Sequence, residues 1–244
     1  MKIATYNICH CANFENWDGG EGPINVKRTA EAISEIDADI IGLNEVYTSG
    51  DREDFELQEE KLAKFAGYPY YVFAKGKEFP WSTIGNAILS KYPIVSVKKI
   101  IVSAPTPEER NPDENEWYED RVLLCAEIDM NGKNIYVIST HFGLNRTEVI
   151  RIVEAVCKEI DTHSEVVLMG DLNLLPDSEF LEPLYARLKS VAKELGNNEY
   201  TFSTFDPQVQ IDHIFVPKIA KIKKYTVYKN KVSDHRPISA EIEF

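Results

Sequence analysis

The sequence contains few cysteines, and they follow no framework. Among 244 residues there are four, at Cys9, Cys11, Cys125 and Cys157, which are too few and too scattered for a set of disulfides. The run Cys9-His10-Cys11 brings two thiols and an imidazole together, but no second cluster with metal-ligand spacing follows it. We therefore expect reduced thiols packed beside a strand end, with a zinc-binding module at this run as the less favoured alternative.

Long hydrophobic runs are missing as well. No stretch approaches the roughly 18 consecutive apolar residues of a membrane-spanning helix, so no membrane span is expected. Residues 1–6 alternate like a strand and lack the apolar segment of a signal peptide. The sequence as it stands therefore predicts a cytoplasmic protein.

Positive charge is scarce relative to negative charge. The chain has 27 Lys and Arg against 40 Asp and Glu, a net charge of −13. Such a protein repels polyanions at long range, so strong non-specific binding to nucleic acid is not expected. A local basic patch or bound Mg²⁺ can reverse the field near a site, so the charge disfavours a nuclease without excluding one. No pattern predicts a protein partner.

Strands and helices alternate along the chain, and no repeat or low-complexity linker divides it. We expect a single domain over residues 1–244. Apolar spacing predicts helices over 26–36, near 53–65 and from about Thr147 onward. Apolar runs and alternation predict strands at 3–8, 39–45, 70–74, 86–90, 94–102, 122–130, 133–139, 166–169 and 238–244. Asn131-Gly132 is typical of a type I′ hairpin, so its two flanking strands should be antiparallel neighbours.

Two segments, 13–24 and 104–120, are predicted to be long surface loops, which often carry function in compact domains. For 104–120, which is rich in proline and acids, a solvated acidic loop is at least as good an interpretation. Trp17, Trp81 and Trp117 fall in or near loops. They could form a hydrophobic rim, but packing beneath loops is the more common fate of tryptophan.

The most informative polar residues lie at the ends of apolar strands. Acids and histidines are poor residues for strand interiors, and burying them without partners is costly. One alone would be interpreted as a capping or surface residue, but here they recur at strand after strand. We therefore expect one shared site at a rim of the sheets, formed by Asn7, Glu45, His141, Asp171, Asn173, Asp212, Asp234 and His235.

These residues stand in a series of ordered motifs. The motifs are Thr5-Tyr6-Asn7, Leu43-Asn44-Glu45-Val46, Gly85-Asn86-Ala87-Ile88-Leu89-Ser90, Ser139-Thr140-His141, Gly170-Asp171-Leu172-Asn173, Ile211-Asp212-His213-Ile214 and Ser233-Asp234-His235-Arg236-Pro237-Ile238. In this order, over nearly the whole chain, they resemble the motifs of the endonuclease/exonuclease/phosphatase superfamily. The resemblance implies an α/β fold, a four-layer sandwich of two mixed β-sheets packed face to face with helices outside.

The resemblance and the chemistry together predict a metal-dependent phosphoester hydrolase. A phosphoester repels nucleophiles because it is negatively charged, so a hard cation with oxygen ligands is needed to neutralise it. We expect Mg²⁺, with Mn²⁺ as a possible substitute. The resemblance implies Glu45 as the main metal carboxylate, Asn7 beside it, and Asp234 as a further ligand through water.

The resemblance also implies catalytic roles. Asp171 and Asn173 orient or activate the attacking water and bind phosphate. His235 is the general base or a phosphate-orienting cation, with its tautomer fixed by Asp212. His141 donates a hydrogen bond to a phosphoryl oxygen as charge develops. The choice of base among Asp171, His141 and His235 stays open.

Other polar residues near these motifs are secondary candidates. His213 follows Asp212 directly, and strand alternation turns it away from the site, so we expect a structural role. Arg121 resembles an arginine of bacterial family members, and it and Asn145 are candidates for contact with the substrate phosphate. His10 is a candidate for the substrate mouth.

The shared machinery does not identify the substrate. The Trp-x-x-Phe-x-Leu-Ser-Asp-His ending typical of abasic-site endonucleases is missing, and residues 228–232 read Tyr-Lys-Asn-Lys-Val instead. Together with the acidic charge, this favours a phosphodiesterase or phosphatase acting on a small or lipid-like phosphate ester. A nuclease acting on DNA or RNA is the alternative. An inactive scaffold is disfavoured, because it has no physical need for this set of residues.

Overall fold

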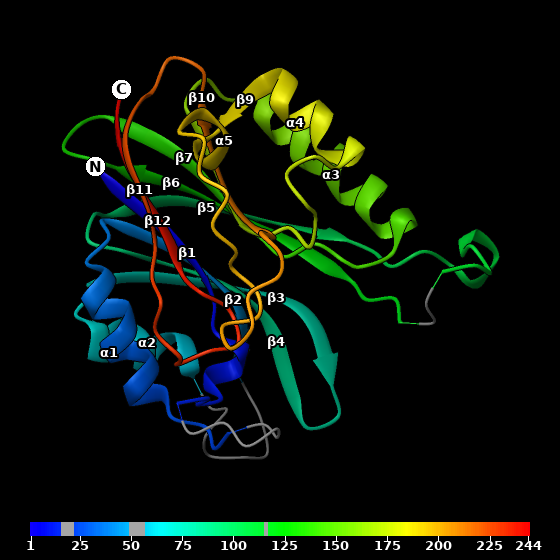
Figure 1. The fold of residues 1–244 in the computed structure, drawn as a ribbon, viewed down its shortest axis with the longest axis horizontal. Helices are drawn as coiled ribbons and strands as arrows, with labels where there is room; N and C mark the ends of the chain where they lie inside the picture. Colours follow the sequence, from blue (N-terminus) through cyan, green and yellow to red (C-terminus); the bar gives the residue numbers. More distant parts are fainter. Residues whose placement is uncertain (16–21, 49–56, 115–116) are drawn as a thin grey trace.

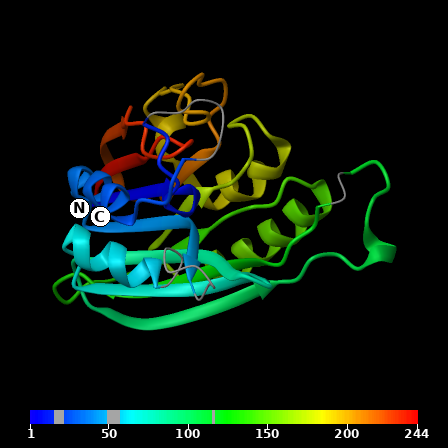
Figure 2. The same ribbon diagram turned by 90° about the horizontal axis from the view of Figure 1, so that it is seen from below.

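The structure, a computed structural model, describes residues 1–15, 22–48, 57–114 and 117–244. Within these ranges the strands form two mixed six-stranded sheets. The sheets pack face to face and carry helices on their outer sides (Figures 1 and 2). The four-layer α/β sandwich that the resemblance implied is confirmed.

The first sheet has the strand order β11-β12-β1-β2-β4-β3. Its one parallel pair is β1 and β2, which helix α1 (Val26–Ile36) connects as a crossover. The other neighbouring strands are antiparallel. The strand bounds are β1 Lys2–Asn7, β2 Ile40–Thr48, β3 Tyr70–Phe79, β4 Ser82–Ser90, β11 Lys221–Val227 and β12 Ile238–Glu243.

The second sheet has the order β5-β6-β7-β8-β10-β9. Here β7 and β8 are the parallel pair, connected by α3 (Arg146–Asp161). The Asn131-Gly132 turn has positive φ at both residues, and it joins β6 and β7 as antiparallel neighbours, as predicted. The strand bounds are β5 Ile94–Val102, β6 Arg121–Asp129, β7 Asn134–Thr140, β8 Val166–Asp171, β9 Leu188–Ser190 and β10 Asp212–Pro217.

Three hydrophobic layers hold the sandwich together. Ile88 and Met169 belong to the layer between the two sheets. Helices α1 and α2 (Gln58–Ala66) pack on the first sheet through residues such as Ile33. Helices α3 and α4 (Glu182–Arg187) pack on the second through residues such as Ile152. The other helical elements in the described ranges are short: η1 Cys9–Cys11, η3 Pro107–Glu109, η4 Glu179–Leu181 and α5 Val191–Glu194.

Three predicted segments extend beyond what the structure describes. One is the loop predicted over 13–24, of which 16–21 lie outside the described residues. The helix predicted near 53–65 begins at Gln58 in the structure, and 53–56 lie outside the described residues. Segment 104–120 projects from the sandwich in Figure 2, with 115–116 undescribed. Among the described residues, no helix is long and apolar enough to cross a membrane.

The fold brings the carboxyl ends of both parallel pairs to one rim. Strands β1 and β2 in one sheet, and β7 and β8 in the other, end there. Gly170 lets the end of β8 pass close to the backbone of Thr140 at the end of β7. It has a φ of +152°, and a Cβ atom would lie 1.8 Å from the Thr140 carbonyl oxygen. Only glycine fits this conformation, which positions the following Asp171 at the rim.

Candidate active site

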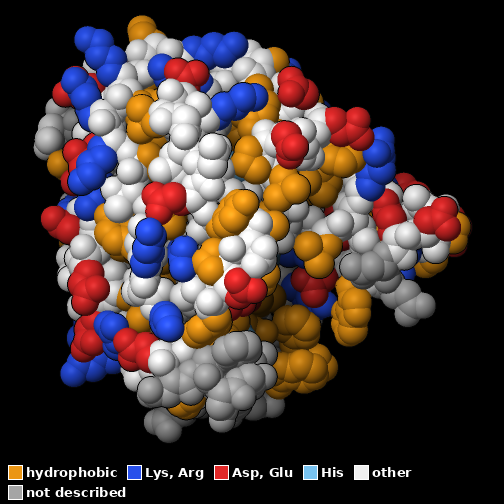
Figure 3. Space-filling view, viewed as in Figure 1, with side chains coloured by type: hydrophobic (Ala, Val, Ile, Leu, Met, Phe, Trp, Pro, Cys, Tyr) orange, Lys and Arg blue, Asp and Glu red, His pale blue; other side chains and the backbone are white. Residues whose placement is uncertain are grey.

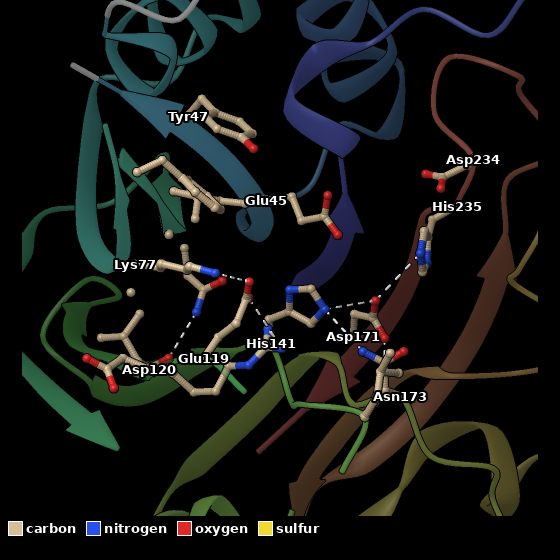
Figure 4. Close-up of a pocket in the computed structure, with 18 of the residues that line it drawn as sticks. Glu45, Tyr47, Lys77, Glu119, Asp120, His141, Asp171, Asn173, Asp234 and His235 are labelled. Atoms are coloured by element: carbon tan, nitrogen blue, oxygen red, sulfur yellow. Dashed lines mark hydrogen bonds and ion pairs between the residues drawn. The ribbon is translucent and has the colours of Figure 1, made fainter. Parts of the chain in front are cut away.

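A pocket of about 440 Å³ opens at this rim. Figure 3 shows a hollow at the base of the projecting 104–120 segment, with charged side chains inside and hydrophobic side chains around its mouth. Both sheets contribute to its wall, and the predicted site residues that line it are Glu45, Arg121, His141, Asp171, Asn173, Asp234 and His235. Figure 4 shows how these side chains, apart from Arg121, lie around the pocket.

A β-bulge in β2 directs the Glu45 side chain into the pocket. Pairing between β2 and β4 runs regularly to Leu43 and resumes at Val46, so the two residues between them oppose a single residue of β4. Glu45 has a φ of +56°, which is uncommon for a residue with a side chain. Bulges re-aim side chains, and strained backbone of this kind is found where function requires it.

The environment of Glu45 favours its protonated form. Burial raises its pKa to about 7, and the nearby Asp234 and Asp171 add to this effect. The hydrogen bond from Asn7 and the charge of His235 oppose the shift. The carboxylates therefore repel one another, and a bound cation would relieve that repulsion.

Asn7 links carboxylates from the two sheets. Its Nδ2 donates to Glu45 Oε1 and to Asp171 Oδ2, each at 3.0 Å. Its Oδ1 accepts a hydrogen bond from the Cys9 backbone N–H at 3.1 Å. In this arrangement Asn7 positions the carboxylates through its nitrogen. Direct metal ligation by Asn7 stays a prediction.

His235 lies between two carboxylates. Its Nδ1 is 3.0 Å from Asp212 Oδ2 and its Nε2 is 3.5 Å from Asp171 Oδ2. Burial alone would lower its pKa, but these two carboxylates, together with Asp234, outweigh burial and raise the pKa to about 10. The resemblance implied this contact with Asp212. Asp234, the immediate neighbour of His235 in the sequence, points to the other side in extended backbone and is poorly placed to orient it. At neutral pH this imidazole is a cation.

His141 has the opposite character. Its Nε2 lies 3.1 Å from Asn173 Nδ2 and 3.4 Å from Asp171 Oδ2. Burial lowers its pKa to about 4, although Asp171 opposes the shift. Asn173 is itself fixed, since its Nδ2 donates to the Phe142 carbonyl at 3.1 Å and its N–H donates to Asp171 Oδ1 at 3.0 Å. A neutral and a charged histidine thus flank one carboxylate.

We expect the two histidines to titrate far apart. In a ¹⁵N-detected NMR titration, His235 should stay protonated from pH 6 to 8, because its pKa of about 10 lies above that window. His141 should stay neutral over the same window, because its pKa of about 4 lies below it. Spectra of His141→Ala and His235→Ala assign the signals. Two imidazoles titrating together near pH 6.5 would show that Asp212 and burial do not separate them.

Asp234 reaches the pocket from the loop before β12. Its Oδ1 accepts a hydrogen bond from Ser233 Oγ at 3.1 Å, and the same hydroxyl lies 2.8 Å from the Asn7 carbonyl oxygen. Ser233 thus ties this loop to the end of β1. The sequence signal for the contacts of Ser233 was its position in the Ser233-Asp234-His235 motif.

Two buried asparagines that sequence reasoning left without a role join the sheets beneath the site. Asn44 donates to the Thr140 carbonyl at 3.1 Å and accepts from the Asp171 N–H at 2.9 Å. It also donates to Asn86, at 2.9 Å, and Asn86 donates to the Val122 carbonyl at 2.9 Å. Both asparagines stand inside the ordered motifs of the sequence, and that position was the available signal for their role.

Arg121 lines the pocket together with three charged residues that sequence reasoning missed, Lys77, Glu119 and Asp120. Arg121 Nη2 lies 3.5 Å from Glu119 Oε2, and Lys77 Nζ lies 2.6 Å from Glu119 Oε1 (Figure 4). Glu119 therefore holds two cations at the wall. The position of Glu119 near Arg121, at the end of the acidic segment, was a sequence signal for its place in the pocket. No sequence signal pointed to Lys77. A phosphate contact by Arg121 stays a prediction.

Asn145 and His213 have contacts outside the pocket. Asn145 is not among the described residues that line it, and its Nδ2 donates to the Trp117 carbonyl at 2.8 Å. Its proposed contact with substrate phosphate gains no support from this position. His213 faces away from Asp212, and its Nε2 lies 2.8 Å from the Leu174 carbonyl oxygen, as expected for a structural residue.

The expectation that the tryptophans pack beneath loops is wrong for two of them. Trp81 is 54% exposed and Trp117 is 76% exposed. Trp81 stacks on Phe79, at 5.5 Å between ring centroids, where β3 and β4 extend past the other strands. Trp17 lies outside the described residues.

Comparison with known proteins identifies the family. Residues 4–235 match the model of the Endonuclease/Exonuclease/phosphatase family, so the chain belongs to this family. Its members are hydrolases that act on phosphoesters.

Similar proteins include one from Escherichia coli (strain K12) and two of known structure. The uncharacterized protein YbhP of E. coli is 27% identical over 236 residues, which cover 87% of this chain and 86% of YbhP. The endonuclease/exonuclease/phosphatase from Beutenbergia cavernae has a TM-score of 0.78 and 21% identity, covering 99% of this chain and 71% of the other. The mannosyl-6-phosphatase Bt3783 of Bacteroides thetaiotaomicron has a TM-score of 0.75 and 16% identity, covering 100% of both chains. At these identities the two structures show the shared fold.

Proposed function

We propose that this protein is a Mg²⁺-dependent hydrolase of small phosphate esters, either diesters or monoesters. The observation that carries the proposal is the convergence of carboxylates around two histidines, one neutral and one cationic. Environments that push two titratable groups apart in pKa are typical of sites for acid–base and electrostatic catalysis.

The donor set of the pocket fits a hard divalent cation. Glu45, Asp171 and Asp234 all offer oxygen atoms, which Mg²⁺ prefers, with Mn²⁺ as a substitute. The raised pKa of Glu45, about 7, results from burial near other carboxylates. In this proposal Glu45 and Asp234 hold the cation, and Asn7 positions Glu45. When bound, the cation neutralises charge on the phosphoryl oxygens.

The other residues have complementary roles in the proposal. The His235 imidazolium donates a hydrogen bond to a phosphoryl oxygen and stabilises the charge that develops there. Asp212 positions His235 through the 3.0 Å contact. Asp171 is held by N–H groups of Asn7 and Asn173, and it orients the attacking water or accepts its proton. Neutral His141 accepts from Asn173 Nδ2 at Nε2, so its one N–H donor is Nδ1, which adds no charge.

The walls of the pocket favour a small substrate. A volume of about 440 Å³ lies within the range of small-molecule sites. Two cationic side chains of the wall, Lys77 and Arg121, are both engaged with Glu119. The net charge of −13 opposes a polynucleotide. The likeness in fold to a mannosyl-6-phosphatase is compatible with this choice.

A substrate panel tests the proposal. Bis-aryl and aryl phosphates, a sugar 6-phosphate, inositol phosphates, sphingomyelin and plasmid DNA are each assayed with Mg²⁺ and with Mn²⁺. We expect turnover of a small ester, with His235→Ala as the control for contaminating phosphatases and nucleases. We also expect a Kd for duplex DNA weaker than micromolar at ~0.15 M salt. Efficient DNA cleavage, with DNA binding at sub-micromolar Kd, would instead establish the nuclease alternative.

A further inference from the structure

The chain makes an unusual turn directly after β1. Three consecutive residues with side chains, Cys9, His10 and Cys11, have positive φ angles of 42°, 44° and 64°. Left-handed backbone is uncommon for such residues and persists only where the surroundings hold it. Here Gln58 Nε2 donates to the His10 carbonyl at 3.0 Å, and the Ala12 N–H donates to the Cys9 carbonyl at 2.8 Å.

This turn brings two metal-binding side chains to Glu45. One ligand atom each from Cys9, His10 and Glu45 lie within 4.8 Å of one another. Cys9 Sγ is 3.9 Å from His10 Nδ1. The His10 ring packs edge-on against Tyr47 at 5.0 Å between centroids, which restricts its orientation. A thiol, an imidazole and a carboxylate therefore meet at the margin of the catalytic pocket.

Cys11 does not belong to this cluster. It is fully buried in the layer beneath α1, and burial raises the pKa of its thiol to about 12. The expectation of a packed, reduced thiol is confirmed for Cys11, whereas Cys9 is only partly buried and lies with His10 and Glu45.

We propose that Cys9, His10 and Glu45 form a second metal site that binds a thiophilic divalent cation such as Zn²⁺. Thiolate, imidazole and carboxylate are the donors that Zn²⁺ takes in proteins, whereas Mg²⁺ prefers oxygen donors alone. Three protein ligands leave the fourth tetrahedral position to water. The site is distinct in its donors from the oxygen-rich site of Glu45 and Asp234, but it shares Glu45 with it.

Sharing Glu45 has a consequence that rests on the proposed function. A carboxylate drawn toward Zn²⁺ at Cys9 and His10 is withdrawn from Mg²⁺. Occupation of the second site should therefore inhibit Mg²⁺-dependent hydrolysis, and the two cations should compete.

Metal binding itself can be measured without any activity. Metal-free protein is titrated with Zn²⁺ against a chromophoric chelator, and with Co²⁺ to detect the thiolate-to-metal charge-transfer band. The wild type should bind one Zn²⁺ and show the band. Cys9→Ser should lose the band and at least ~10-fold in Zn²⁺ affinity, while Cys157→Ser, which changes a thiol on the distant helix α3, should behave like the wild type. Equal Zn²⁺ affinity in Cys9→Ser, or no charge-transfer band in the wild type, would overturn the site. Should Cys9→Ser fail to fold, His10→Gln serves as the second variant, with the same loss of affinity expected.

Measuring hydrolysis in the presence of Zn²⁺ distinguishes a failure of the second metal site from a failure of the proposed function. Stoichiometric Zn²⁺ should inhibit the wild type, while Cys9→Ser should keep its Mg²⁺-dependent activity and resist Zn²⁺. Zn²⁺ binding through Cys9 in a protein without phosphoesterase activity would support the site and refute the proposed function. Zn²⁺ binding through Cys9 that leaves hydrolysis unchanged would refute the sharing of Glu45.

Discussion

Glu45→Gln is expected to lower kcat for phosphoester hydrolysis by at least ~10²-fold, about 2.7 kcal/mol of transition-state stabilisation. Glutamine keeps the shape of the side chain but removes the charge that holds the cation. The loss should appear in kcat together with a weaker apparent affinity for Mg²⁺, measured by titrating the metal at saturating substrate. Glu60→Gln removes the same charge from the exposed face of α2 and should leave both unchanged.

The same substitution should stabilise the metal-free protein at alkaline pH. The pKa of Glu45 is raised from 4.5 to about 7 in the folded state, so the folded chain retains a proton that the unfolded chain has released. Stability therefore falls as pH rises from about 4.5 through 7, by roughly 1–3 kcal/mol. Glu45→Gln removes this penalty. An inactive variant that is also less stable than the wild type at pH 8 would point to a folding defect rather than to a lost metal ligand.

His235→Ala and Asp212→Ala are each expected to lower kcat by ~10²- to 10³-fold, the usual range for losing one donor that stabilises charge in the transition state. The double variant should be little worse than His235→Ala alone. The reason is that Asp212 acts only through His235: its Oδ2 lies 3.0 Å from Nδ1, and both side chains are buried. Residues that act as a unit show such non-additive losses.

Two measurements distinguish this positioning role of Asp212 from a general structural one. In Asp212→Asn, which conserves shape, the pKa of His235 should fall toward that of a free imidazole, because the first of the three carboxylates that raise it, Asp212, is gone. The second measurement is the kcat of the two single variants and of the double variant, compared as a double-mutant cycle. Losses that multiply in the double variant would mean that the two residues act independently.

The elements that were predicted well are those whose signals are local. The helix over 26–36 and the strand over 94–102 were located to the residue, because apolar periodicity and flanking turn residues define them without help from the rest of the chain. The Asn131-Gly132 hairpin followed from turn chemistry. The grouping of site residues at one rim followed from a simple rule, that polar residues at successive strand ends meet at the same edge.

The features that were missed depend on pairing between distant segments. The bulge that turns Glu45 into the pocket exists only because β2 pairs with β4. Strand β3 continues through the polar run 75–77 to Phe79 because β4 provides its partner. Strand β11 carries lysines on an edge and lacked apolar alternation. Tertiary pairing overrides local preference in such strands. The Lys77–Glu119 ion pair was missed for a related reason, because it joins residues that are far apart in the sequence.

Dependence of hydrolysis on a divalent cation is most directly tested with protein stripped by a chelator and assayed on whichever small phosphate ester the substrate panel identifies. We expect no turnover in excess chelator, full recovery when Mg²⁺ is added beyond the chelator, and substitution by Mn²⁺. Full activity in excess chelator would contradict the assignment of Glu45 and Asp234 as metal ligands.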